Sequence, residues 1–287
     1  MTCLIQTEAN NAIFLRNRTP GKTKFLNVIQ GRNERESAFW YQRVRNGEFE
    51  GWAFAGKHHT QLSMTLRRLI DMHRDGLLAN VEWIHFLGIS TLKAAFALTY
   101  IQRALRRFGQ APNVQISFDS SSPTQAVAKG AQAIVGFDLS LNKWNFRAEK
   151  IILADNMVGG RTLGEVSRAW QSGGPDRMAV TTHVGEIVPI AELTKLGADG
   201  RHHFGAKQFA LVVHHNTQAF LEGFRRAYAY LDQRYAEKHP PALQRLQLYM
   251  ETVFAPPVGA EVFDPDRALT VVNELAPELD ALMMEQL

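Results

Sequence analysis

Cysteine is almost absent from this chain. The 287 residues include a single cysteine, Cys3, and their ten histidines show no spacing typical of a metal site. One thiol cannot close an intramolecular disulfide, and structural zinc sites are commonly built on several thiolates. We therefore expect no disulfide framework, no structural zinc held by a single chain, and no other cofactor.

Long apolar runs are absent as well. No stretch reaches about 18 apolar residues, the length that a membrane-spanning helix requires. Residues 1–11 lack the apolar core of a signal peptide. Both absences predict a cytoplasmic protein that has no membrane partner.

The overall composition is that of a globular protein. Hydrophobic residues make up 45% of the chain and charged residues 21%, and the length allows one large α/β domain. The net charge is +4 and the isoelectric point is about 9.2. This mild basic excess is compatible with a nucleic-acid partner, although many enzymes with other substrates are equally basic.

One carboxylate stands where a strand is predicted to end. The apolar run from Val114 to Phe118 is typical of a short buried strand, and Asp119 follows it directly. Three serines and a proline come next, which indicates a loop. In parallel α/β folds this position faces the active site, so Asp119 is a candidate nucleophile, base or metal ligand. The alternative is an aspartate that caps the loop or the next helix.

The first half of the chain alternates between strand and helix patterns. Strands are predicted at residues 25–29, 51–55, 82–87 and 114–118, with helices at 34–45, 61–73 and from 91 to 108. This alternation predicts a parallel sheet. Catalytic groups should then lie at the strand ends, where the chain places Gln30, Gly56, Gly88 and Asp119.

The second half is less regular. We expect a helix and turn over residues 125–136, a mixed segment over 143–155, a short strand or buried turn at 209–213, and helices over 216–238 and 267–287. The chain therefore divides into an α/β region with the candidate site, residues 1–155, and a mostly helical region packed on the same domain, residues 156–287.

Four segments near these strand ends resemble one known family. They are Asn27–Gly31, Gly51–Lys57, His85–Ser90, and Phe118–Asp119 followed by Pro123–Thr124. In the same order they are similar to the Val-Gln-Gly, Gly-Tyr-Ala-Ile-Gly-Gly-Leu, Leu-Met-Gly-Val-Gly-Thr and Phe-Asp…Pro-Thr motifs of the tRNA-guanine transglycosylases. The resemblance runs from about Thr7 to Asp155, with a weaker echo at His214-His215-Asn216.

The resemblance implies a fold and an activity. The family fold is a TIM-barrel-like α/β barrel of eight strands, and these segments look like its last four strands. Members exchange guanine for a 7-deazaguanine base in nucleic acid. The reaction passes through a covalent bond between an aspartate and C1′ of the sugar, as in retaining glycosidases.

The resemblance also implies residue roles. Asp119 matches the nucleophile, and Gln30 matches the glutamine that reads the base, since an amide both donates and accepts hydrogen bonds. Gly56 and Lys57 match positions whose backbone contacts the base, and Gly88 is a further substrate-binding candidate. For Gln30 the alternative is a polar residue satisfied at a strand end.

Two side chains in the segment that follows Asp119 are candidates for nucleic-acid binding. Gln125 and Lys129 stand where the family has two arginines, and a lysine binds phosphate as a point charge. The alternative for Lys129 is a solvated charge on a helix.

The chain departs from the family in two respects. It lacks the Cys-x-Cys-x-x-Cys zinc cluster, and His214 or His215 resembles only the histidine of that site. It also lacks the N-terminal half, which carries an Asp-Ser-Gly-Gly-Phe-Gln motif with an acid/base aspartate, and four strands cannot close a barrel. A second polypeptide or a homo-oligomer is therefore a possible partner that completes the barrel.

Several functions remain open. The zinc-free, serine-rich nucleophile loop favours the DNA-directed, phage-type branch of the family, so we expect DNA rather than tRNA as the substrate. A tRNA-guanine transglycosylase is the first alternative, and a non-catalytic partner subunit that binds nucleic acid is the second. The third is an unrelated α/β enzyme whose strand ends match by chance.

Overall fold

The structure, a computed structural model, describes residues 2–140, 143–151, 160–196, 198, 202–232 and 239–284. The chain forms two compact units. The first comprises Met1–Ile89, Lys93–Asp119 and Ala242–Glu285, and the second comprises mainly Ser120–Pro241. The region boundary expected at residue 155 lies outside the described residues and stays a prediction. No helix in the described part of the chain is long and apolar enough to cross a membrane.

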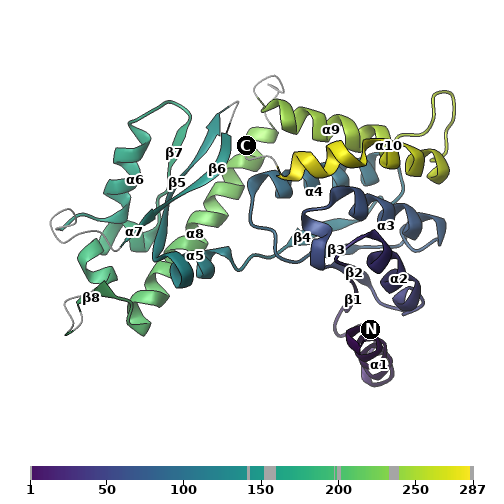
Figure 1. The fold of residues 1–287 in the computed structure, drawn as a ribbon, viewed down its shortest axis with the longest axis horizontal. Helices are drawn as coiled ribbons and strands as arrows, with labels where there is room; N and C mark the ends of the chain where they lie inside the picture. Colours follow the sequence, from purple (N-terminus) through teal and green to yellow (C-terminus); the bar gives the residue numbers. More distant parts are fainter. Residues whose placement is uncertain are drawn as a thin grey trace. The chain divides into compact units, whose positions relative to one another are not determined.

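The first unit is built on a four-stranded parallel sheet (Figure 1). The strands β1 (Leu26–Ile29), β2 (Gly51–Phe54), β3 (Trp83–Phe86) and β4 (Gln115–Phe118) pair in chain order, each with the next. The predicted strands and their parallel pairing are confirmed. The fold is thus mixed α/β, and these four strands form an open sheet.

Helices alternate with these strands, as the sequence predicts. The first unit contains α1 (Thr2–Asn17), α2 (Glu34–Val44), the 3-10 turn η1 (Gly56–His59), α3 (Leu62–Arg74) and α4 (Leu92–Arg107). Asn33 caps α2 by accepting a hydrogen bond from the backbone N–H of Glu36. Because this cap fixes the start of α2, it also limits the positions of the loop residues between Gln30 and Asn33.

The two faces of the sheet differ in burial. In one row of the register, Ile29, Phe54 and Phe86 are all at most 1% exposed, and the rings of Phe54 and Phe86 stack with centroids 4.8 Å apart. In the neighbouring row, which points to the other face, His85 and Ser117 are only partly buried. The first face therefore forms the core of the unit.

Two C-terminal helices return to the first unit. They are α9 (Pro241–Phe254), which the sequence analysis did not anticipate, and α10 (Pro265–Met284), which matches the predicted last helix. The carboxylate of Asp280 on α10 accepts hydrogen bonds from the backbone N–H and the hydroxyl of Ser63, at 3.0 and 2.9 Å. This bond ties the start of α3 to α10, more than two hundred residues later in the chain.

The second unit has a different architecture. Its antiparallel sheet has the order β6-β5-β7, formed by β5 (Gln132–Ser140), β6 (Lys143–Lys150) and β7 (Arg177–Ala179). A small ribbon joins β8 (Lys195–Leu196) to β9 (His202–His203). The helices are α5 (Ser122–Gly130), α6 (Leu163–Gln171), α7 (His183–Ile187), the 3-10 turn η2 (Ile190–Leu193) and α8 (Ala206–Leu231).

Two expectations for this unit are wrong. The helix and turn predicted over residues 125–136 end earlier than expected. The helix α5 ends at Gly130, Ala131 adopts a left-handed conformation with φ of 50°, and the apolar run after it is β5. That run is buried because β6 and β7 flank it. Residues 209–213, predicted as a short strand or a buried turn, form the second turn of α8, where Val212 is fully buried in the core. Short apolar runs do not distinguish strand from buried helix.

A buried His-Asn pair joins α8 to β5. Asn216, which is fully buried, accepts from the backbone N–H of Ile134 at 2.8 Å and donates to the carbonyls of Pro123 and Gln132. His215 bonds through Nε2 to the carbonyl of Ile134 at 2.8 Å and through Nδ1 to the hydroxyl of Thr182 at 2.6 Å. The polar atoms of both side chains are therefore occupied by hydrogen bonds within the second unit.

We predict that Asn216→Ala destabilises the protein by about 2–4 kcal/mol, because it leaves buried backbone groups without partners. Thr217→Ala removes an exposed hydroxyl on the same helix and should change the free energy of unfolding by less than about 0.5 kcal/mol. Urea unfolding followed by circular dichroism measures both values. Equal effects of the two substitutions would contradict the role assigned to Asn216.

Candidate functional site

The four predicted strand-end residues lie along one edge of the parallel sheet. Gln30 directly follows β1, Gly56 lies two residues after β2, Gly88 two residues after β3, and Asp119 directly after β4. Neighbouring strands are about 4.8 Å apart, so roughly 14 Å separates the end of β1 from the end of β4 in a flat sheet. Gln30 and Asp119 therefore mark the two ends of this edge.

The Asp119 carboxylate is fixed by the loop that follows β3. Its Oδ1 accepts a hydrogen bond from the backbone N–H of Gly88 at 2.8 Å, and its carbonyl accepts from Ile89 N–H at 2.9 Å. The N–H of Asp119 in turn donates to the carbonyl of Phe86 at 3.2 Å. The side chain is still 57% exposed. One oxygen is thus held while the other stays accessible.

His85 lies on the other side of this carboxylate. Its Nε2 is 3.8 Å from Oδ2 of Asp119, and its Nδ1 is 2.8 Å from Oγ of Ser117. Trp83 Nε1 donates to the same Oγ at 2.6 Å. Because an indole N–H can only donate, Ser117 can give its own hydrogen to Nδ1 of His85. That arrangement puts the proton of a neutral imidazole on Nε2, facing Asp119.

Sequence reasoning missed His85 and Trp83 as parts of this site. The signal was the two-residue alternation of strands: Trp83 and His85 share a face of β3, as Ser117 and Asp119 do around the end of β4. Three serines follow Asp119, and their hydroxyls could donate to its carboxylate. The donor in the structure is the backbone N–H of Gly88, whereas Ser120 Oγ accepts from Ser122 N–H.

A pocket of about 430 Å³ opens at the other end of the edge, beside β1. The residues that line it come from α1, α2 and the two loops after β1 and β2: Cys3, Leu4, Gln30, Gly31, Arg32, Glu36, Phe39, Trp40 and Gly56. Trp40 is oriented by a hydrogen bond from Nε1 to the carbonyl of Val28 at 2.8 Å. The pocket combines aromatic walls with the exposed amide of Gln30, a combination suited to a planar polar ligand.

Gly56 and Gly31 are required by the packing of their two loops. Gly56 has a φ of +70°, and a Cβ on it would lie 2.6 Å from the carbonyl oxygen of Gly31. That carbonyl accepts from the N–H of Lys57 at 2.9 Å, while the Lys57 side chain is exposed. Gly56, which the family resemblance places against the base, is therefore also required by the packing of the two loops.

A buried histidine supports the turn that contains Gly56. His58 is 2% exposed, and its ring nitrogens bond to the hydroxyls of Ser37 at 3.0 Å and Thr65 at 3.2 Å. Burial lowers the pKa of His58 to about 3, with the nearby Arg68 adding to the effect. His58 is therefore neutral at physiological pH and holds η1 against α2 and α3.

The structure places the other predicted site residues in three different surroundings. Gly88 bonds to Asp119, and Gln30 and Gly56 line the pocket beside β1. Gln125 and Lys129 are exposed on α5, which belongs to the second unit. Their role in nucleic-acid binding stays a prediction.

Two histidines resemble the zinc ligand of the family, and one of them, His215, is a core residue, whereas His214 is exposed. Both ring nitrogens of His215 bond to protein groups, and burial lowers its pKa to about 4. Within the described ranges, no group of three or more histidine, cysteine, aspartate or glutamate side chains could hold a metal ion. The expectation that no zinc is bound stays a prediction.

Comparisons with protein-family models, with curated proteins and with solved structures find no match for this chain. The family resemblance therefore rests on the four short segments. The interpretation of the site rests on the geometry of this chain.

We predict that Gly56→Ala destabilises the protein by about 2–4 kcal/mol, because a left-handed φ and a steric clash with Gly31 act together. Gly76 is the matched control, since its φ is +69° and its Cβ would meet nothing within 4 Å. Gly76→Ala should therefore cost only about 1 kcal/mol. Thermal unfolding of both variants compares them, and equal losses would exclude the clash.

We predict that stability falls as the pH is lowered from about 6.5 to 5. The unfolded chain binds a proton at His58 near pH 6.5, whereas the folded chain binds it only near pH 3. This group alone should remove about 1.4 kcal/mol per pH unit in that interval. The dependence should become shallower in His58→Gln and stay unchanged in His183→Gln, where an exposed histidine is replaced. Urea unfolding at each pH tests this, and identical slopes in all three proteins would refute it.

Proposed function

We propose that this protein is a transglycosylase that exchanges guanine for a 7-deazaguanine base in nucleic acid, with DNA as the favoured substrate. The observation that carries the proposal is the geometry of Asp119. Its carboxylate follows a parallel strand, accepts one backbone hydrogen bond at Oδ1, and exposes Oδ2 next to His85. Catalytic groups of parallel α/β enzymes occupy such strand ends.

In this mechanism the two carboxylate oxygens of Asp119 have different roles. With Oδ1 held by Gly88 N–H, Oδ2 attacks C1′ of the target nucleotide and forms an ester as the bond from C1′ to guanine breaks. The departing base takes the bonding electron pair and then a proton. The incoming base, after losing a proton, attacks C1′ and releases the carboxylate, so that two displacements retain the configuration of the sugar.

The pocket beside β1 supports the role of Gln30 in reading the base. The exposed amide of Gln30 lies in a pocket with Phe39 and Trp40, and the backbone at Gly56 forms part of the same wall. An amide that both donates and accepts is matched to the edge of a purine-like ring. Lys57 and Gly88 lie along the same edge. Their N–H groups bond to Gly31 and to Asp119, so these two residues would shape the site and not donate to the base.

The sheet topology supports the family interpretation of the fold. In a barrel, consecutive parallel strands pair in chain order, whereas a doubly wound sheet reverses its order at a switch point. Here β1 to β4 pair in chain order. We infer that they correspond to one half of a TIM-barrel-like transglycosylase fold, and that a second polypeptide or a second copy of the chain completes it.

A second candidate function is a non-catalytic partner subunit. It is favoured by the missing Asp-Ser-Gly-Gly-Phe-Gln motif, because base exchange in the family uses the aspartate of that motif as acid/base. Under this alternative the chain binds nucleic acid, in DNA or tRNA form, and does not form the covalent intermediate.

We predict that Asp119→Asn abolishes the covalent intermediate and leaves nucleic-acid binding intact, because the amide keeps the shape of the carboxylate but is not a usable nucleophile. The measurement is trapping on denaturing gels with a labelled DNA oligonucleotide or tRNA and a 7-deazaguanine analogue. The protein is assayed alone and with a polypeptide that carries the missing motif.

Asp176→Asn is the control, because it makes the same chemical change at an exposed aspartate of the second unit. Trapping that persists in Asp119→Asn would place the nucleophile elsewhere. If no protein traps or exchanges bases under any of these conditions, the partner-subunit function becomes the better one. Trapping of tRNA but not of DNA would reverse the assignment of the substrate.

A further inference from the structure

The imidazole of His85 stands beside the Asp119 carboxylate without being bound to it. The distance of 3.8 Å between Nε2 and Oδ2 is too long for a direct hydrogen bond. The two side chains are 20% and 57% exposed, so solvent and substrate have access to both. A ligand that contacts Oδ2 is therefore within reach of Nε2.

The hydroxyl of Ser117 lets the ring of His85 carry either one proton or two. A hydroxyl has one hydrogen to donate and two lone pairs that accept. One lone pair accepts from Trp83 Nε1 at 2.6 Å. Ser117 Oγ can then donate its hydrogen to Nδ1 of a neutral ring at 2.8 Å or, after rotation of the hydroxyl, accept from Nδ1–H with the second lone pair. The same side chains thus fit both neutral tautomers and the imidazolium.

The proposed base exchange needs a proton at this place. The departing guanine takes up a proton, and the incoming base loses one. Retaining glycosidases, which react in the same two steps, keep their nucleophile and their acid/base group about 5–5.5 Å apart. The distance of 3.8 Å between Asp119 and His85 is shorter, so Nε2 is within reach of the bond that breaks when Oδ2 attacks C1′.

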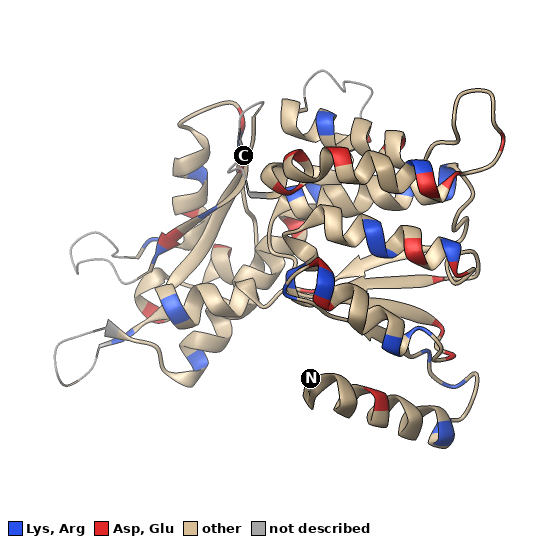
Figure 2. Cartoon of the chain, turned by 45° about the vertical axis from the view of Figure 1, so that its right-hand side comes forward, with Lys and Arg blue, Asp and Glu red and all other residues tan. Residues whose placement is uncertain are grey.

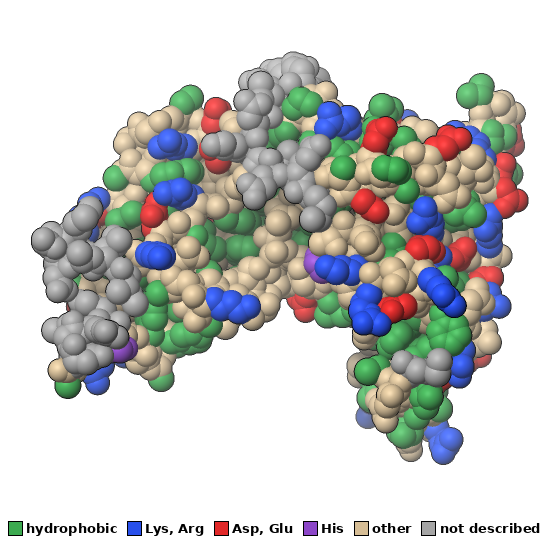
Figure 3. Space-filling view, in the orientation of Figure 1, with side chains coloured by type: hydrophobic (Ala, Val, Ile, Leu, Met, Phe, Trp, Pro, Cys, Tyr) green, Lys and Arg blue, Asp and Glu red, His purple; other side chains and the backbone are tan. Residues whose placement is uncertain are grey.

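Other titratable groups near the strand ends are engaged elsewhere. Glu36, in the pocket beside β1, bonds through both oxygens to Arg32, and this hydrogen bond lowers the pKa of its carboxyl. His58 is buried with both ring nitrogens bonded. Along the helices in Figure 2 and over the surface in Figure 3, acidic and basic side chains are interspersed. Neither Glu36 nor His58 offers the proton that the departing base takes.

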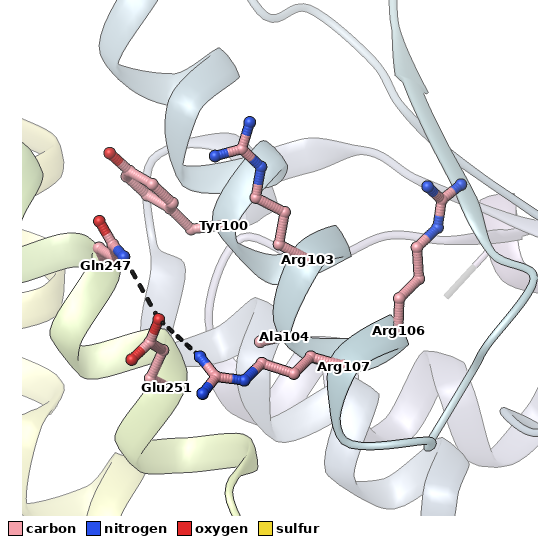
Figure 4. A pocket seen from close by; sticks show the side chains of 7 residues that line it. All are labelled: Tyr100, Arg103, Ala104, Arg106, Arg107, Gln247 and Glu251. Atoms are coloured by element: carbon pink, nitrogen blue, oxygen red, sulfur yellow. Dashed lines mark hydrogen bonds and ion pairs between the residues drawn. The ribbon is translucent and has the colours of Figure 1, made fainter. Parts of the chain in front are cut away.

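A further pocket, of about 480 Å³, lies between α4 and α9 and holds a phenol and a carboxylate (Figure 4). Burial raises the pKa of Tyr100 to about 12, and Glu251 accepts from Gln247 at 3.3 Å. Arg106, also in this pocket, bonds to the carbonyl of Val114 directly before β4. The pocket therefore lies toward the start of β4, whereas Asp119 follows the end of that strand.

We propose that His85 is the acid/base residue of the base exchange and that Ser117 is its positioning residue; this rests on the proposed function. In the first step Oδ2 of Asp119 bonds to C1′, and the departing base takes the electron pair of its broken bond and the Nε2 proton of the imidazolium. In the second step Nε2 accepts a proton from the incoming base, whose nitrogen bonds to C1′ and returns an electron pair to Oδ2.

Protons and charges balance over this cycle. Asp119 and His85 begin as a carboxylate and an imidazolium, become an ester and a neutral imidazole, and then return to the first state. One proton leaves with the departing base and one arrives with the incoming base. Strands β3 and β4 therefore supply both the nucleophile and the proton, and no second polypeptide is needed for the proton.

The test compares two leaving bases, guanine and 7-methylguanine, at one position of a DNA oligonucleotide. 7-Methylguanine is already positively charged, so it departs as a neutral base without receiving a proton. His85→Gln keeps an amide near the position of Nε2 but cannot transfer a proton. We expect this variant to slow guanine release by about 10²–10⁴-fold and 7-methylguanine release by less than about threefold. Single-turnover base release by the protein alone, followed by chromatography, measures both rates.

Three further variants sharpen the comparison. Ser117→Ala should show the same selectivity for the leaving base with a smaller loss, about tenfold on guanine. His85→Ala should regain guanine release when imidazole is added. His183→Gln is the matched control, because it replaces an exposed histidine of the second unit and should change neither rate. Unfolding curves check that each variant is folded.

The outcomes separate this role from the proposed function. Equal losses with both bases in His85→Gln, without rescue of His85→Ala by imidazole, would make His85 a structural residue and overturn the proposal. Guanine release that requires an added polypeptide with the Asp-Ser-Gly-Gly-Phe-Gln motif would also overturn it, while the transglycosylase stands. If the wild-type protein releases neither base under any condition, the transglycosylase is rejected and the role of His85 with it.

Discussion

The in-register parallel pairing of β1 to β4 is the constraint on which the candidate site depends. It brings four strand ends that are far apart in the chain to one edge, and it aligns His85 with Ser117 on one face. The loop bonds that hold Asp119 follow from the same register, because Asp119 N–H continues the ladder to Phe86 and Gly88 N–H then meets the carboxylate. A shift of one residue would turn Asp119 and His85 to the opposite face.

Neutral buried groups keep this edge in shape. His58 holds the turn after β2 through two hydroxyls, and the approach of Gly56 to Gly31 locks that turn onto the loop after β1. The charged and titratable side chains at the edge, Asp119 and His85, stay partly exposed. The fold thus separates the groups that build the edge from those that are available for chemistry, as expected where a rigid scaffold presents reactive side chains on loops.

Two pockets of the first unit, both lined by described residues, differ in chemistry as well as in place. The one beside β1 has aromatic walls and an amide, whereas the one between α4 and α9 has three arginines and a neutral phenol. The helix α4 connects the two ends of the sheet, so one element relates the position of the arginine-lined pocket to that of Asp119.

The sequence by itself determined the parallel α/β pattern and the strand-end positions of Gln30, Gly56, Gly88 and Asp119. It could do so because alternating apolar runs and turn residues are local signals. The tertiary structure alone decided that Gly88 N–H binds Asp119, that His85 faces it, and that His215 is a core residue rather than a ligand. It also decided that α9 and α10 return to the first unit and that residues 209–213 are helical. These features depend on contacts between residues distant in the chain, and composition and periodicity within a short window carry no information about such contacts.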